Sequence, residues 1–170
     1  MDIMKGQKLD LSDILSLISK CVKHMQSQGL YQWDELYPNS DIIESDLNNE
    51  DAYVLKDDGK CIAYVAINEE QSPEYSQVNW HTDGRKVLVI HRLCVHPKFQ
   101  SKGIAKQMIT FCEEMAMTGG YTCIRLDTYS KNQKALKLYE YLDYQKSGQV
   151  FFPFKPDPFY CFEKSINDNL

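Results

Sequence analysis

The sequence predicts a single α/β (α+β) domain, residues 1–170, in which a mixed, mostly antiparallel sheet of six to seven strands is flanked by about four helices. Three observations predict this fold. Residues 87–128 have the pattern of a strand, a helix and a second strand, which implies a parallel, right-handed crossover. Residues 52–67 have the pattern of a hairpin, and residues 144–165 that of a closing antiparallel pair. A chain of 170 residues suits one hydrophobic core.

The N-terminal part predicts a short strand over residues 1–5 and two helices. The first helix begins near residue 11, because its apolar residues fall on one helical face: Leu11, Ile14, Leu15, Ile18, Val22 and Met25. We expect Asp10 or Ser12 to cap it and Gly29 to end it. A short second helix is expected through residues 42–47, with Ser40 or Asp41 as its cap.

The hairpin consists of strands 52–56 and 60–67 around the tight turn Asp57-Asp58-Gly59. Residues 68–85 are polar and rich in turn residues, and they include the pair Trp80-His81. They predict a long loop. A loop of this length in a compact domain is usually functional or mobile.

The central stretch begins with a nearly continuous apolar run over residues 87–95, typical of a buried strand that Pro97 ends. The spacing then becomes that of a helix, on the face of Ile104, Met108, Phe111 (or Cys112) and Met115, which Gly119-Gly120 terminates. A strand over residues 122–128 follows. A last helix opens at Ser130 or Lys131-Asn132 and has Ala135, Leu138, Tyr139 and Leu142 on its inner face. Strands 144–152 and 159–165 close the sheet around the proline-rich loop 153–158.

Composition narrows the class of protein. No apolar run approaches the ~18–20 residues that span a bilayer, and no secretion signal opens the chain. The six cysteines lie mostly within apolar elements without a C-x-x-C motif, and the four histidines are isolated. We therefore expect reduced thiols in a cytoplasmic protein and no metal site. The net charge of −5 argues against nucleic-acid binding and favours a cationic acceptor.

The turn Gln100-Ser101-Lys102-Gly103-Ile104-Ala105 joins the central strand to its helix. A helix start leaves backbone N–H groups pointing outward at the positive end of the helix dipole, which suits a phosphate or pyrophosphate. Neither G-x-G-x-x-G nor the G-x-x-x-x-G-K-[ST] loop is present, so the two best-known nucleotide loops are excluded, and with them a nucleotide-binding regulator. A strand-to-helix turn without a ligand is the alternative.

Two separate segments resemble the GCN5-related N-acetyltransferase (GNAT) family. Gln100-x-x-Gly103-x-Ala105 after V-H-P resembles its pyrophosphate loop, and Asn132 to Tyr144 resembles its N-x-x-A-x-x-L-Y-E-K-x-G-F signature, with Asp143 in place of the usual glycine. The match spans essentially the whole chain. It implies acetyl-CoA as cofactor, bound by Leu93, Cys94, Val95, Gln100, Ser101, Lys102, Gly103, Ile104, Ala105 and Asn132. An N-cap is the structural alternative for Asn132, and the two roles are compatible.

The resemblance also implies catalytic roles. Tyr139 matches the tyrosine that serves as general acid toward the cofactor sulfur; the alternative is a core-facing aromatic. His91 matches a histidine of some members that can act as base, and a hydrogen-bonded histidine within the sheet is the alternative. Trp33, Tyr37 and Trp80, with His81, belong to loops that border the acceptor cleft in related folds; a homodimer contact or a satellite core would also explain them.

The predicted function is therefore that of an N-acetyltransferase, which moves the acetyl group of acetyl-CoA directly to a primary amine. A small-molecule amine and a peptide or protein N-terminus both remain open as acceptors. The alternative is a noncatalytic acyl-CoA-binding regulator on the same fold, because fold alone does not fix function. We expect no nucleic-acid or membrane partner.

Overall fold

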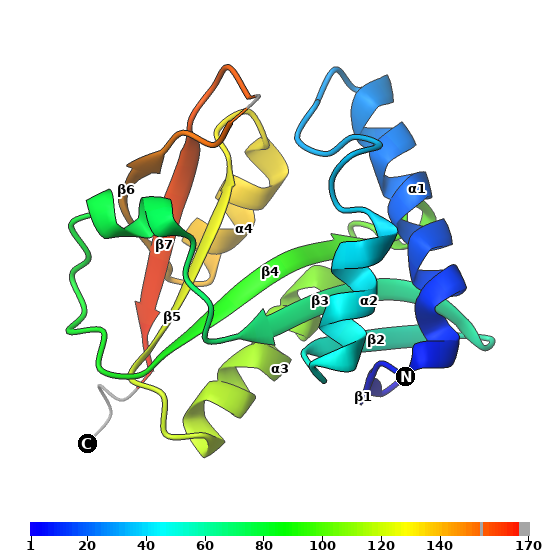
Figure 1. Cartoon of the computed structure of the whole chain (residues 1–170), viewed down its shortest axis with the longest axis horizontal. Coiled ribbons are helices and arrows are strands. Elements are labelled where there is room, and N and C mark those ends of the chain that lie inside the picture. Colours follow the sequence, from blue (N-terminus) through cyan, green and yellow to red (C-terminus); the bar gives the residue numbers. More distant parts are fainter. Residues whose placement is uncertain (154, 167–170) are drawn as a thin grey trace. The chain divides into compact units, whose positions relative to one another are not determined.

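The computed structural model describes residues 1–153 and 155–166, and it contains a seven-stranded sheet in the order β1-β2-β3-β4-β5-β7-β6 (Figure 1). The strands are β1 (Ile3–Lys5), β2 (Ala52–Asp57), β3 (Lys60–Asn68), β4 (Val87–Val95), β5 (Cys123–Tyr129), β6 (Gln145–Val150) and β7 (Phe159–Ser165). The α-helices are α1 (Leu11–Ser27), α2 (Ser40–Asn48), α3 (Ile104–Thr118) and α4 (Gln133–Tyr141). Short 3₁₀ turns are η1 (Lys8–Asp10), η2 (Pro73–Gln77) and η3 (Pro97–Phe99).

This architecture confirms the predicted fold class. The β4–β5 pair is parallel, as the strand-helix-strand pattern predicts, whereas β1–β2, β2–β3, β5–β7 and β6–β7 are antiparallel. The predicted bounds are within a residue or two of the observed ones for most elements. The predicted loop at residues 68–85 contains η2, and Phe154 of the proline-rich loop lies outside the described residues.

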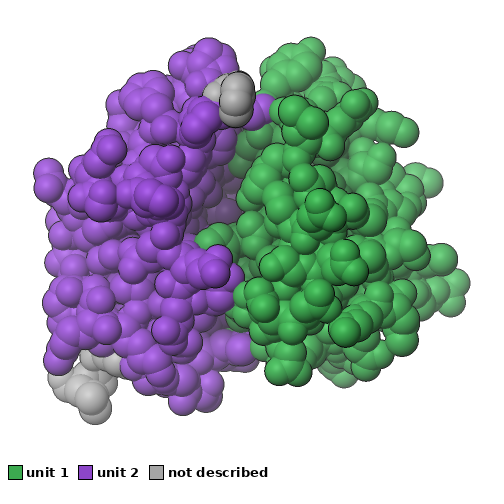
Figure 2. All heavy atoms as spheres, viewed as in Figure 1, with its two compact units in different colours: residues 1–67, 91–111 green, residues 68–90, 112–170 purple. Residues whose placement is uncertain are grey.

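The chain divides into two compact units (Figure 2). Residues 1–67 and 91–111 form the first unit, and residues 68–90 and 112–170 form the second. The boundaries fall inside β4 and α3, so each of these elements contributes residues to both units. The expectation of a single domain over the whole chain stays a prediction.

In the first unit, α1 and α2 bury their apolar faces against one face of β2 and β3. The buried cluster consists of Ile14, Leu17, Ile18, Cys21, Val22, Trp33, Ile43, Leu47, Ala52, Val54, Cys61, Tyr64, Ala66 and Cys94. Successive strand residues point to opposite faces. Tyr53, beside Val54, therefore points away from this cluster, and its ring lies 5.0 Å from that of Phe111 on α3. Asp58 (φ 48°) and Gly59 (φ 73°) are both left-handed, which is the geometry of a two-residue hairpin turn.

In the second unit, α4 packs against the strand pair β5–β7, and the ring of Tyr139 lies 5.7 Å from that of Phe162. The long loop before β4 is held by two buried charged side chains. Glu163 accepts hydrogen bonds from the backbone N–H groups of His81 (2.9 Å) and Thr82 (2.6 Å). Arg125 donates to Gln71 (2.8 Å), and its guanidinium carbon lies 4.2 Å from the centroid of the Trp80 ring.

Two predicted helix caps differ from the structure. The side chain of Asn39, not Ser40 or Asp41, accepts the hydrogen bond of the α2 N-terminus, from the N–H of Ile42 (3.1 Å). Asp10 precedes α1, but its carboxylate makes no capping bond to that helix. It accepts instead from the N–H of Gln7 and forms an ion pair with Lys56 at 2.6 Å. A nearby cation and an earlier N–H therefore outcompete the expected cap.

Candidate functional site

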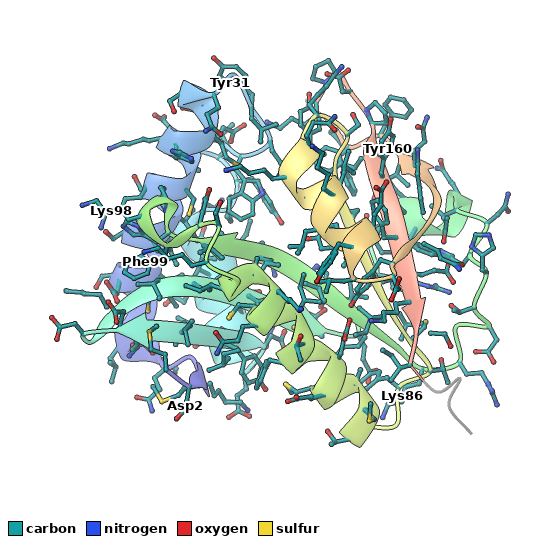
Figure 3. All side chains as sticks on the ribbon, turned by 180° about the vertical axis from the view of Figure 1, so that it is seen from behind. Asp2, Tyr31, Lys86, Lys98, Phe99 and Tyr160 are labelled. Atoms are coloured by element: carbon teal, nitrogen blue, oxygen red, sulfur yellow. The ribbon has the colours of Figure 1, made fainter. Side chains whose placement is uncertain are left out.

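The turn that leads into α3 has a partly left-handed backbone. Ser101 (φ 61°) and Gly103 (φ 82°) are left-handed, and the first turn of the helix closes with a bond from the Gln107 N–H to the Gly103 carbonyl (3.0 Å). The N–H groups that precede Gln107 have no carbonyl one turn earlier in the helix. A Cβ placed on Gly103 would meet no heavy atom of the described residues within 4 Å. The space beside Gly103 is therefore open among the described residues. Figure 3 marks Lys98 and Phe99 on η3, which leads into it.

Gln100 joins this loop to the end of β4. Its side-chain amide donates a hydrogen bond to the Val95 carbonyl (3.0 Å), which also accepts from the Cys21 thiol (3.4 Å). The Val95 carbonyl, predicted to contact the cofactor, therefore already accepts two hydrogen bonds from side chains of the protein. Lys102 is exposed, with its ammonium group 5.3 Å from the centroid of the Phe99 ring, while Ile104 is buried beneath the loop.

The C-terminal half of β4 contains a backbone irregularity that the sequence could not reveal. Arg92 is left-handed (φ 54°) within an otherwise extended strand. A left-handed residue in a strand is typical of a β-bulge, which interrupts the ladder of hydrogen bonds. His91, Arg92 and Leu93 are half-buried, whereas Cys94 and Val95 are buried. The irregularity thus falls beside the residues predicted to contact the cofactor and next to His91.

A buried charge network holds Arg92. Its Nε and Nη2 atoms donate to the two carboxylate oxygens of Asp46, and its Nη1 donates to the hydroxyl of Tyr37 (3.2 Å). Tyr64 donates to the same carboxylate at 2.5 Å. Burial and the negative charge of Asp46 raise the pKa of Tyr64 well above its usual value. Burial disfavours the cation of Arg92, but its bonds to Asp46 and Tyr37 outweigh this and raise its pKa.

In the second unit, Asn132 precedes the first residue of α4, and Tyr139 lies in the last turn of this helix. Asn132 caps the helix, because its side chain accepts a bond from the Ala135 N–H (3.1 Å). Tyr139 is buried, and its pKa is raised first by burial and then by electrostatic interaction with Asp127. At the helix end, Asp143 adopts the left-handed conformation (φ 65°) that a glycine would otherwise supply.

Asp127 and Tyr75 form a hydrogen-bonded pair that the sequence analysis did not predict. The Tyr75 hydroxyl donates to Asp127 Oδ2 at 2.5 Å. Although solvent reaches part of Asp127, the surrounding protein raises the pKa of its carboxyl to about 6, mainly by desolvation. The acidic residue Asp127 within the predicted strand 122–128 was the one indication in the sequence. Its partner Tyr75 lies 52 positions earlier, so the pair itself could not be predicted.

The residues expected near the acceptor have different surroundings. Trp33 is buried in the core of the first unit, whereas Tyr37 is exposed and accepts a hydrogen bond from Arg92. Trp80 is half-buried and donates from Nε1 to the Tyr75 carbonyl (3.0 Å). His81 is exposed, with Nδ1 3.2 Å from Ser147 Oγ.

All six cysteines are buried as free thiols. Across the described residues, no three histidine, cysteine or acidic side chains gather as a metal site would require. None of the described helices is both long and apolar enough to cross a membrane.

Comparison with known proteins gives one consistent match. The description of the acetyltransferase (GNAT) family fits residues 16–144. Rat N-acetyltransferase 8F1 is 31% identical over 113 residues, which are 66% of this chain and 48% of that protein. The N-acetylaspartate synthetase of Danio rerio is 30% identical over 108 residues, 64% of this chain and 38% of that protein. The chain thus spans about half the length of these relatives, or less.

Solved structures share the fold. A GNAT-family acetyltransferase from Streptococcus agalactiae superposes with a TM-score of 0.82 at 24% identity, covering 96% of this chain and 94% of that one. The Salmonella typhimurium protein yncA, solved with its cofactor acetyl-CoA, has a TM-score of 0.74 at 16% identity and covers 100% of this chain and 96% of that one.

Proposed function

The chain belongs to the acetyltransferase (GNAT) family, and we propose that it transfers an acetyl group from acetyl-CoA directly to a primary amine. The acceptor is a small-molecule amine or the amine of a peptide. The observation that carries the proposal is the open, left-handed turn at Ser101–Gly103, which begins α3 in the way a pyrophosphate-binding loop requires. A cytosolic location is part of the proposal, supported by six buried thiols without a disulfide.

We propose that the start of α3 and the C-terminal half of β4 provide most of the contacts with acetyl-CoA. The N–H groups at the start of α3, around Gly103, Ile104 and Ala105, fit the pyrophosphate. The left-handed residue Arg92 interrupts the extended backbone of β4 just before Leu93 and Cys94, and a bulge of this kind would free backbone groups for an extended pantetheine chain. Gln100 orders the loop through the Val95 carbonyl, and Asn132 joins its capping role to contact with the cofactor.

In the proposed acetyl transfer, one side chain accepts a proton and another donates one. Bound acetyl-CoA would supply the thioester carbon that the amine attacks. His91 takes the proton that the amine loses, directly or through water, because a neutral imidazole has one ring nitrogen that can accept a proton. Tyr139 gives a proton to the leaving thiolate. Its raised pKa keeps this phenol protonated across the neutral range.

The test is thioester turnover against a panel of primary amines, followed by release of free thiol. Amine-dependent thiol release supports the transferase. Stabilisation of the protein by coenzyme A without thiol release for any amine would favour the noncatalytic acyl-CoA-binding alternative instead. Loss of both signals in a folded protein would contradict the proposal.

A further inference from the structure

Strand β5 has one residue, Asp127, that is not buried. Every other residue of β5 is buried, whereas Asp127 is half-buried. One of its carboxylate oxygens, Oδ2, accepts a hydrogen bond from the hydroxyl of Tyr75. The other, Oδ1, takes no hydrogen bond from the described residues. A carboxylate with one open oxygen is therefore presented from the middle of a buried strand.

The surroundings of this carboxylate contain phenols, a thiol and another acid. Tyr75 and Glu74 act on it from η2. Tyr139 on α4 and Cys161, its register partner on β7, are close enough for Asp127 to raise their pKa values. None of these groups is a cation. Arg125, two residues earlier on the strand, is engaged with Gln71 and Trp80.

We propose that Asp127 and Tyr75 bind the ammonium group of the acetyl acceptor. Asp127 supplies the anionic oxygen for an ion pair, and Tyr75 holds the carboxylate by its other oxygen. This inference rests on the proposed function. The ligand class is a primary ammonium ion, because a desolvated carboxylate gains most from a cation that also donates hydrogen bonds.

Three observations support a recognition role. Asp127 interacts electrostatically with Tyr139, the proposed acid, so the ammonium site would lie near the group that acts on the donor sulfur. The burial that raises the carboxyl pKa to about 6 is uncompensated by any cation among the groups that act on it. The chain also carries a net charge of −5, which attracts cationic molecules.

The pH dependence has a definite sign. The site binds a cation when Asp127 is ionised, so acceptor affinity is fully present above the folded pKa of about 6 and is lost as pH falls through it. By the same linkage, a bound ammonium ion lowers the Asp127 pKa, because an opposite charge favours the ionised form by ~1–3 units. The hydrogen bond from Tyr75 lowers the pKa of Asp127. Tyr75→Phe removes this bond, so acceptor affinity should be lost at a higher pH than in the parent.

The first experiment titrates the Asp127 carboxyl by carbon-13 NMR in the full chain, with Asp127→Asn to assign the signal. Butylammonium chloride is the probe, and sodium chloride and tetramethylammonium chloride at equal ionic strength are the controls. We expect butylammonium alone to lower the Asp127 pKa. Equal pKa values in the three salts would overturn the proposal.

The second experiment measures stability, which needs no turnover. Because the folded pKa of Asp127 lies above its unfolded value of ~3.9, ionisation of this carboxyl opposes folding as pH rises through about 6. Asp127→Asn keeps a hydrogen-bond acceptor for Tyr75 and should raise the Tm at pH 8 but not at pH 4. A lower Tm at pH 8 would assign Asp127 a structural role and contradict the proposal.

A matched control is Asp157→Asn, which alters a second carboxylate bonded to a tyrosine hydroxyl, that of Tyr129 at 2.9 Å. Once an acceptor is known, Asp127→Asn should raise its KM ~10-fold or more, as for the loss of a charged hydrogen bond, and Asp157→Asn should not. Stabilisation by coenzyme A should survive in both variants. Its absence in the parent would count against the proposed function, while the NMR result would still decide this site.

Discussion

Asp46 and Arg92 form a two-point ion pair across 46 positions of sequence, with Oδ1 2.6 Å from Nη2 and Oδ2 2.8 Å from Nε. Asp46 is the buried partner on α2, and Arg92 is the left-handed residue of β4. The pair therefore ties the one irregular residue of the strand to a helix. Bidentate geometry fixes the guanidinium in orientation as well as in position.

We predict that Asp46→Asn destabilises the protein by about 3–5 kcal/mol, because it removes the buried carboxylate charge that pairs with the Arg92 guanidinium. Urea denaturation measures this change. The matched control is Asp83→Asn, which breaks the exposed pair with Arg85 and should change the stability far less, because solvent screens an exposed ion pair. Equal losses in the two variants would show that the buried pair has no special role.

We predict that Gly103→Glu abolishes the rise in Tm that coenzyme A produces, because its carboxylate would fill the phosphate loop with negative charge. Gly59→Glu is a control for backbone strain. Both glycines are left-handed (φ 82° and 73°), and a Cβ at either meets no heavy atom within 4 Å in the described structure. If both variants respond to coenzyme A like the parent, this turn is not the pyrophosphate site.

Tyr139→Phe keeps the ring that packs on Phe162 but removes the proton donor. Turnover should fall ~10²-fold, the lower end for general acid catalysis because water can substitute in part, while coenzyme A still stabilises the protein. Burial raises the pKa of Tyr139, so the parent should keep its rate up to the ordinary phenol pKa of ~10. Tyr144→Phe, whose ring lies 6.0 Å away, is the control. A Tyr139→Phe rate within about twofold of the parent rules out the acid role.

His91→Gln tests the proposed base. If His91 accepts the amine proton, kcat of the parent should fall on the acidic side of the pH profile, where the imidazole is already protonated. The variant should lower kcat and flatten this acidic limb. Measuring kcat separately from the acceptor KM distinguishes His91 from Asp127, which is proposed to act on binding. An unchanged limb in the variant, together with a lower Tm, would leave His91 a structural residue of β4.

Asp143→Gly should stabilise the protein by roughly 1 kcal/mol, because glycine adopts the left-handed conformation without the Cβ penalty that aspartate bears. Asp143→Ala, which keeps a Cβ and lacks a polar side chain, should not stabilise it. Thermal unfolding of the three proteins makes the comparison. A Gly variant no more stable than the parent would mean that other interactions of Asp143 offset the strain.

The elements of the fold were predictable because their signals are local. Alternating and helical periodicity indicated β4, α3 and β5, and the crossover rule then made β4 and β5 parallel. The cap of α2 was not predictable in this way. Asn39, Ser40 and Asp41 are consecutive residues that can all cap a helix, and periodicity does not choose among them.

The site was predictable only in part. The turn at residues 100–105 has a sequence signature, and so does α4. Arg92 has none, because its left-handed backbone lies in a strand and its residue type is not glycine. What holds it is Asp46, and what positions Asp127 is Tyr75; both partners are distant in sequence. Contacts of this kind depend on tertiary packing, which a single sequence does not display.

The six buried thiols can also report on unfolding of the protein, because each becomes reactive when the structure around it opens. A thiol reacts with an alkylating reagent only when the reagent can reach it. Each cysteine should therefore be modified at a rate set by the opening of the segment that covers it, and mass spectrometry can follow the six sites in one experiment. Cys21 on α1 and Cys161 on β7 would time the opening of each unit separately.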